Sequence, residues 1–144
     1  MKNPNQNNYK SNNWLTLPRV NFENIKHVCK LSDFRMTATL GQGAYGKVVK
    51  VKTKESHNEY AMKIVPKQMI ENLNMIDQLR NEVNIMSMIK HENITELKTY
   101  FEDNRNIYFI LELAEDKHLY ARLKIKGNYP EKQAACYIHD VLKA

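Results

Sequence analysis

Three closely spaced glycines are the first residues in this sequence whose spacing suggests chemistry. The chain has only four glycines, and three of them, Gly41, Gly43 and Gly46, fall within six residues. With Val48 they complete the pattern G-x-G-x-x-G-x-V. Glycine has no Cβ, so the backbone N–H groups of such a loop can approach a phosphate closely. The loop therefore predicts a phosphate-binding site.

A lysine and a small residue share one face of a segment that follows the loop. Residues 59–65 read as a strand, in which Ala61 and Lys63 point to one face and Met62 and Ile64 to the other. A small residue beside a lysine suits an adenine ring with phosphates beyond it. Taken alone, Lys63 is better explained as a surface lysine on a strand.

A glutamate at the edge of an apolar helix stripe is the third candidate. Apolar residues recur at helical spacing along one face of this segment, at Ile76, Leu79, Val83 and Met86. Glu82 lies beside that stripe. A helix glutamate is usually solvated, but one in this position can reach inward, pair with Lys63 and orient its ammonium group.

Both strands and helices are predicted around these residues. Strands are expected over residues 34–40, 47–53, 59–65, 97–101 and 106–113. Short turns between them imply an antiparallel sheet. One long helix is expected over 66–90, a short one over 117–126 that ends at Gly127, and another from Pro130 to the end of the chain.

The strand after the glycine loop separates two kinds of nucleotide site. A G-x-G-x-x-G loop also marks dinucleotide-binding folds, where it opens a helix. Here residues 47–53 are alternating and rich in valine, which is typical of a strand. The strand–loop–strand order disfavours the dinucleotide-binding fold.

Composition limits the class of protein. The 144 residues include 22 Lys and Arg and 16 Asp and Glu, for a net charge of +6, and 42% are hydrophobic. No apolar run approaches the roughly 18 residues that a membrane-spanning helix needs. Residues 1–30 are rich in Asn and predict a disordered tail. Cys29 and Cys136 are too few for a disulfide framework, which favours an intracellular protein.

The order and spacing of these elements resemble the N-terminal lobe of a eukaryotic protein kinase. The resemblance covers residues 33–144 and includes His91-Glu92-Asn93-Ile94, similar to the family's H-P-N-I element with Glu for Pro. Within the family the chain is most similar to Aurora kinases, on segments that include Leu79-Arg80-x-Glu82-Val83, Tyr100-Phe101-x-Asp103, Ile107-Tyr108-x-Ile110-Leu111-Glu112 and Leu119-Tyr120-x-x-Leu123. Polo-like kinases share several of them.

The resemblance implies an α+β fold in three parts. Residues 1–30 would be the tail, 31–114 the kinase-like N-lobe and hinge, and 115–144 the start of a C-lobe. The N-lobe would hold a five-stranded antiparallel sheet and the family's helix C, followed by the first two C-lobe helices. Because the last predicted helix is amphipathic and still running at Ala144, we expect the chain to be truncated before the catalytic loop.

The family resemblance also implies roles for individual residues in binding ATP. The glycines would cover the phosphates, Lys63 would bind the α- and β-phosphates, and Glu82 would pair with Lys63. The remaining contacts would come from apolar residues around the adenine and from the hinge: Leu40, Val48, Ala61, Leu111 in the gatekeeper position, Glu112 and Ala114. Met86 and Leu97 match the regulatory spine, although plain core packing explains them equally well.

Two motifs that phosphoryl transfer requires do not occur in these residues. There is no H-R-D-x-x-x-x-N and no D-F-G, since Asp33-Phe34 is followed by Arg35. The catalytic base and the Mg²⁺ ligands would therefore lie in C-lobe residues beyond this sequence, and the chain alone is expected to be inactive. The alternative is a catalytically inactive kinase-like module that binds partners or acts as a scaffold.

Partners other than ATP and protein substrates rest on weaker patterns. Arg19-Val20-Asn21-Phe22 resembles the R-V-x-F motif that docks on type 1 protein phosphatase. An activator protein is a further expectation. Lys and Arg are scattered along the sequence and form no basic stripe with interleaved aromatic residues, so the sequence does not indicate binding of nucleic acid. The Aurora resemblance implies the cytoplasm or nucleus, at the spindle or centrosome.

Overall fold

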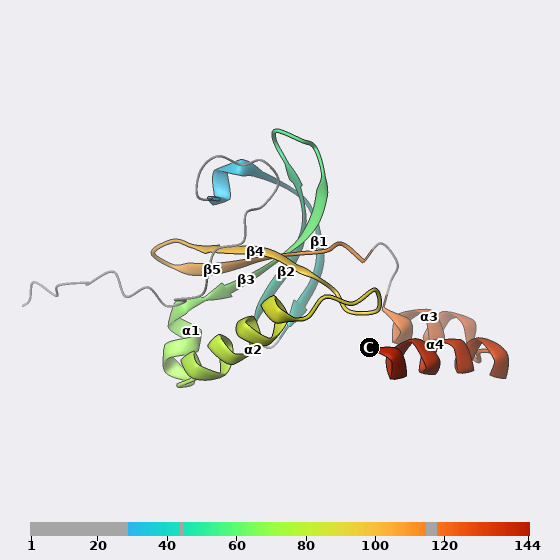
Figure 1. The fold of residues 1–144 in the computed structure, drawn as a ribbon. Coiled ribbons are helices and arrows are strands. Elements are labelled where there is room, and N and C mark those ends of the chain that lie inside the picture. Colours follow the sequence, from blue (N-terminus) through green and yellow to red (C-terminus); the bar gives the residue numbers. More distant parts are fainter. Residues whose placement is uncertain (1–28, 44, 115–117) are drawn as a thin grey trace, which may run out of the picture.

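The five expected strands form one antiparallel sheet, in the order β1-β2-β3-β5-β4 (Figure 1). The computed structural model describes residues 29–43, 45–114 and 118–144, so the tail and the Arg19–Phe22 motif lie outside the described residues, except for Cys29 and Lys30. A short 3-10 helix, Leu31–Asp33, precedes the strands β1 (Phe34–Gly43), β2 (Gly46–Thr53), β3 (Glu59–Pro66), β4 (Leu97–Glu102) and β5 (Asn106–Leu111). The α+β fold expected from the kinase resemblance is confirmed.

Two strand ends differ from those predicted by more than one residue. β1 continues past residue 40 to Gly43, because Gly41, Gln42 and Gly43 remain paired with β2. The glycine loop is therefore mostly a continuation of the β1–β2 hairpin. β5 ends at Leu111 instead of residue 113, since the chain leaves the sheet as it enters the expected hinge.

The single long helix predicted over residues 66–90 is wrong. The structure has two helices there, α1 (Lys67–Asn72) and α2 (Ile76–Met88). Asn74 separates them with φ at 52°, in the left-handed region that asparagine tolerates better than most residues. Because a left-handed residue breaks the helical backbone, α2 starts in a new direction.

An apolar cluster lies on each face of the sheet. The cluster beneath α2 confirms the predicted stripe, because Leu79 and Val83 are 7% and 1% exposed, with Ile76 and Met86 packed around them. The rest of its buried residues are Val65, Ile70, Leu97, Tyr100, Ile107 and Phe109. On the opposite face the buried residues are Phe34, Val49, Val51, Met62, Phe101, Tyr108 and Ile110. The alternation of β3 thus sends Met62 to one core and Val65 to the other.

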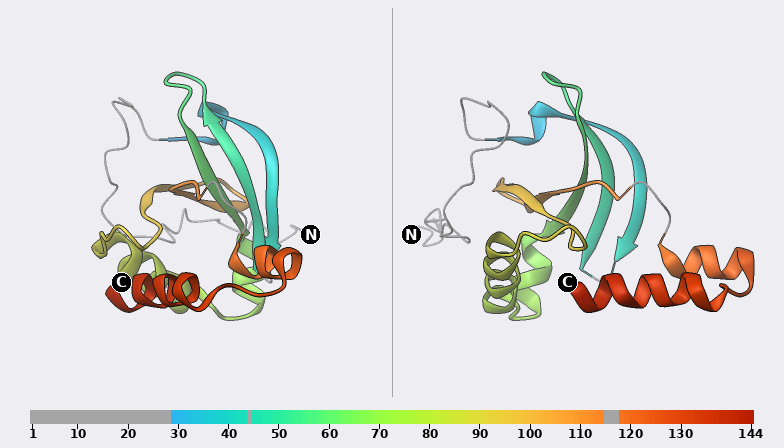
Figure 2. Two further views of the ribbon diagram at one scale, coloured as in Figure 1. Left: turned by 90° about the vertical axis from the view of Figure 1, so that its right-hand side faces the viewer. Right: turned by 45° about the vertical axis from the view of Figure 1, so that its right-hand side comes forward.

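Two helices extend to the side of the sheet (Figures 1 and 2). They are α3 (Leu119–Lys126) and α4 (Glu131–Lys143). α3 ends at Gly127, whose φ of 79° favours glycine. The Asn93 side chain donates a hydrogen bond of 2.8 Å to the Asp140 carbonyl, which joins the loop before β4 to α4. Within the described ranges, no helix combines the length and apolar character that crossing a membrane requires.

Candidate functional site

Residues expected to contact a nucleotide lie in two adjacent rows across the sheet. In the first row Val48 is paired with Lys63, and Lys63 with Phe109. In the second row Ala61 is paired with Leu111. Directly paired residues share a face of a sheet. The antiparallel register therefore brings Val48, Ala61, Lys63 and Leu111 together on the face that α2 covers in part.

The ammonium group of Lys63 is held by Glu82. Lys63 Nζ lies 2.8 Å from Glu82 Oε1, and the side chains are 28% and 48% exposed. Leu79 and Val83 anchor α2 on the sheet, so the turn of α2 that carries Glu82 faces Lys63. A pair this exposed contributes no more than about 1 kcal/mol to stability. Its importance is the direction in which it holds the lysine.

Phe109 is a neighbour of Lys63 that the sequence analysis missed. Its ring centroid lies 5.9 Å from Lys63 Nζ, at the outer limit of a cation–π contact. Its spacing in the sequence could have identified it, because Phe109 lies two residues before Leu111 on the same strand and must share its face. The cation is thus flanked by a carboxylate and an aromatic ring.

The three loop glycines have different structural roles. A Cβ on Gly46 would lie 2.2 Å from the Ile64 carbonyl oxygen, so the close approach of β2 to β3 already requires glycine there. A Cβ on Gly41 would meet no atom within 4 Å, and one on Gly43 only the Gly46 oxygen at 3.6 Å. Packing against β3 explains why residue 46 is glycine. It does not explain the glycines at residues 41 and 43, for which close approach of a phosphate is the better explanation.

The expected hinge begins with two hydrogen bonds between Glu112 and Glu96, one between backbone groups and one to a side chain. The Glu112 N–H donates to the Glu96 carbonyl at 2.9 Å, and Glu112 Oε2 accepts from the Glu96 N–H at 3.3 Å. The hydrogen bond from Lys98 lowers the pKa of the Glu96 carboxyl, against the opposing effect of burial. Ala114 is exposed, as is Leu40 (48%) at the far end of the site on β1.

The donor set suits an adenine nucleotide. Lys63 offers a cation, the open faces of Gly41 and Gly43 leave room beside backbone N–H groups, and Val48, Ala61 and Leu111 form an apolar surface. Ala61 is 8% exposed, while Val48 and Leu111 are partly buried. Among the described residues, no group of three or more His, Cys, Asp or Glu side chains is placed to hold a metal ion.

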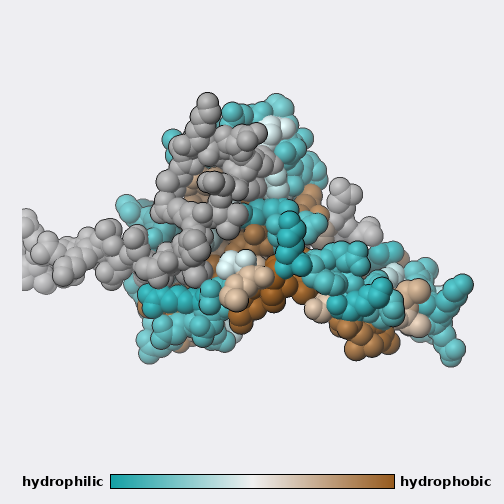
Figure 3. Space-filling model, viewed as in Figure 1, coloured by the Kyte–Doolittle hydropathy of each residue, from teal (hydrophilic) through white to brown (hydrophobic). Residues whose placement is uncertain are grey.

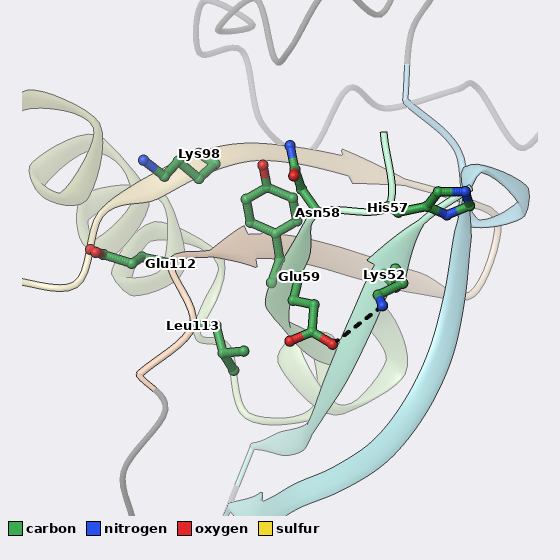
Figure 4. A pocket seen from close by; sticks show the side chains of 8 residues that line it. Lys52, His57, Asn58, Glu59, Lys98, Glu112 and Leu113 are labelled. Carbon is green, nitrogen blue, oxygen red and sulfur yellow. Dashed lines mark ion pairs between the residues drawn. The ribbon is translucent and has the colours of Figure 1, made fainter. Parts of the chain in front are cut away.

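An open hollow of about 640 Å³ lies at the other side of the hinge (Figure 4). Figure 4 shows side chains from the β2–β3 turn, β4 and the hinge around it. It shares only Glu112 with the residues expected to bind ATP, and its lining is Lys52, His57, Asn58, Glu59, Tyr60, Lys98, Glu112 and Leu113. Its mixed charge, with three basic and two acidic side chains, indicates no ligand class.

Comparison with known proteins agrees with this geometry. The protein kinase domain family matches residues 34–144. The chain is 38% identical over 114 residues to Aurora kinase of Candida albicans and 36% identical over 114 residues to serine/threonine-protein kinase Aurora-1 of Arabidopsis thaliana. It is 30% identical over 115 residues to serine/threonine-protein kinase PLK4 of Danio rerio. Each alignment covers 79% of this chain but only 22%, 39% and 12% of the respective relatives.

Proposed function

This chain belongs to the protein kinase family, and we propose that it is the ATP-binding portion of a serine/threonine protein kinase. The observation that carries the proposal is the 2.8 Å pair of Lys63 and Glu82, on the sheet face that also holds Val48, Ala61 and Leu111. In this proposal residues 31–114 form the N-lobe and hinge and residues 115–144 begin the C-lobe. The similarity to Aurora and other serine/threonine kinases supports that class of acceptor.

The residues of this chain would divide the work of holding ATP. The glycine loop covers the phosphates, with open space at Gly41 and Gly43, and the Lys63 ammonium donates to the α- and β-phosphates. Glu82 keeps that ammonium oriented. Leu40, Val48, Ala61 and Leu111 surround the base, and backbone groups of Glu112 and Ala114 meet its edge. Glu82 is therefore a positioning residue, because Glu82 acts on ATP only through Lys63.

Transfer of the phosphoryl group needs more than these residues supply. ATP bound with Mg²⁺ supplies the γ-phosphoryl group that a complete kinase transfers to a Ser or Thr hydroxyl. These 144 residues contain no H-R-D-x-x-x-x-N or D-F-G. We therefore propose that the chain alone binds ATP and transfers nothing, with the Mg²⁺ ligands in the C-lobe of the complete protein. The absence of both motifs equally favours an inactive module that binds partners.

The experiment measures ATP affinity by isothermal titration calorimetry for the chain and for Lys63→Met, Glu82→Gln and Lys67→Met. Lys67 is the control, because its ammonium pairs with Glu102 at 2.9 Å, close to the 2.8 Å of Lys63 and Glu82, and it belongs to α1, which contributes no residue to the proposed site. We expect a loss of at least tenfold for Lys63→Met, a smaller loss for Glu82→Gln and none for Lys67→Met. Unchanged affinity in Lys63→Met refutes the site, and a wild-type chain that binds no ATP favours the partner-binding module.

Other partners follow from the family and the tail. We propose protein substrates and an activator protein for the complete kinase, and a type 1 phosphatase contact at Arg19–Phe22. The similarity to Aurora kinases supports a place in the cytoplasm or nucleus. The test of the motif is whether Phe22→Ala abolishes capture of the phosphatase. Phe34→Ala cannot serve as its control, because Phe34 is buried.

A further inference from the structure

The excess positive charge of the described residues is concentrated in one segment. Residues 29–114 hold 12 Lys and Arg and 11 Asp and Glu, so the sheet lobe is close to neutral. Residues 118–130, which contain α3 and the turn after it, hold Arg122, Lys124 and Lys126 and no Asp or Glu. Glu115 and Asp116 precede α3 in the sequence and lie outside the described residues.

Several lysines of the sheet lobe pair closely with carboxylates. Four of them have an ammonium nitrogen within 3 Å of a carboxylate oxygen, in the pairs Lys50–Glu59, Lys63–Glu82, Lys67–Glu102 and Lys98–Glu96. Local pairing of this kind leaves little field beyond the surface. The sheet lobe therefore offers an acidic partner little net attraction.

The lysines of α3 are held by aromatic rings instead. Lys124 Nζ lies 4.8 Å from the Tyr120 ring centroid, and Lys126 Nζ lies 5.4 Å from that of Tyr129. Within the described part of the chain, neither ammonium has a carboxylate oxygen within 4 Å. A cation–π contact positions the ammonium without neutralising it. The helix dipole favours lysines in this last turn, but it too leaves their charge in place.

We propose that the α3 basic surface, defined as Arg122, Lys124 and Lys126 with Tyr120 and Tyr129, binds an acidic segment of a partner protein. All three basic residues belong to α3, and Lys124 and Lys126 are exposed. Figure 3 shows hydrophilic surface along the upper side of α3 and α4 and a hydrophobic patch along their lower side. The right view of Figure 2 shows α3 beyond the glycine-loop end of β1, while α4 runs back toward the loop that follows α2.

The spacing of the charges favours a protein segment over a membrane surface. Arg122 and Lys126 are four residues apart and share one side of α3, whereas Lys124 is two residues from each and lies on another side. A flat anionic surface meets only one side of a helix. An extended acidic chain that crosses the end of α3 can reach both sides.

The test uses a fluorescein-labelled peptide with three Glu residues on each side of a Ser, and the same peptide with Gln for Glu. Binding to the chain is followed by fluorescence anisotropy at two salt concentrations. The variant is Lys124→Glu with Lys126→Glu. The matched control is Lys54→Glu with Lys90→Glu, two exposed lysines of the sheet lobe that produce the same net charge. ATP affinity is measured on the same samples.

We expect the acidic peptide to bind at least tenfold tighter than the Gln peptide, and the α3 variant to lose about tenfold while the control loses less than threefold. Equal losses in both variants, or no binding of the acidic peptide, overturn the proposal. So does lysine-dependent binding to phosphatidylserine vesicles without peptide binding.

Two further readouts keep the result clear. If circular dichroism shows that the Glu variant is unfolded, the Gln variants of the same two pairs are compared under the same criteria. Unchanged ATP affinity in the α3 variant separates this surface from the nucleotide site. Peptide binding by a chain that binds no ATP would refute the proposed function and leave this inference standing.

Discussion

Replacing Gly46 by Ala separates the structural glycine of the loop from the others. The added Cβ would lie 2.2 Å from the Ile64 carbonyl oxygen, and contacts below 3.0 Å essentially do not occur, so β2 or β3 must move by at least 0.8 Å. The obstacle is backbone, which cannot rotate away as a flexible side chain can. Overpacking of this kind typically costs about 1–3 kcal/mol. We expect Gly46→Ala to lower the free energy of unfolding by that amount.

Gly41→Ala is the matched control for the steric argument. The substitution is chemically identical and five residues away, but its Cβ would meet no atom within 4 Å. Loss of freedom in the unfolded chain can even stabilise such a variant, by roughly 0.4–1 kcal/mol. Both variants are unfolded in urea, and the midpoints are compared at equal slope. Equal midpoints for Gly46→Ala and Gly41→Ala would refute the claim that strand approach requires glycine at residue 46.

Three further predictions concern the elements around the site. Val83→Ala should lower stability by about 2 kcal/mol in a urea melt, because Val83 is 1% exposed beneath α2, whereas Ile85→Ala (55% exposed) should change it by less than about 0.5 kcal/mol. Gly127→Ala should cost about 1 kcal/mol in the same assay, since φ is 79° although the space is open, and no change would contradict the strain expected for a side chain at this positive φ. Burial raises the pKa of Asp103, but hydrogen bonds from Tyr108 and from the N–H groups of Arg105 and Asn106 outweigh it and leave that pKa lowered. The stability that Asp103 confers is therefore present above the pKa of the unfolded carboxyl and lost as pH falls through the lower folded value. Asp103→Asn should therefore reduce the fall in the free energy of unfolding, measured in urea, as the pH drops below about 4. The same pH dependence in the variant and the wild type would refute this.

The Lys63–Glu82 pair links the core to the nucleotide site. The buried residues Leu79 and Val83 hold α2 on the sheet, and Glu82 lies between them in the sequence. A cavity beneath α2 would therefore loosen the carboxylate that orients Lys63. If Val83→Ala weakens ATP binding as well as stability, the two effects have one cause in the position of α2.

Local patterns in the sequence were sufficient for most elements. Partial alternation, β-branched residues and the polar turns between apolar runs predicted all five strands. Helical spacing predicted the buried stripe of α2, and Gly127 marked the end of α3. The break at Asn74 was missed, because apolar spacing continues across it while a single left-handed residue redirects the backbone.

The sequence by itself determined the order of the elements, the glycine loop and the residue types of the site. Only the tertiary structure decided which of these residues meet. The register of β2, β3 and β5 aligns Val48, Lys63 and Phe109, and the packing of α2 brings Glu82 within 2.8 Å of a lysine 19 residues earlier. The tertiary structure also showed that Gly46 is required by Ile64 of β3. Contacts between distant segments depend on register and packing, which no local pattern contains.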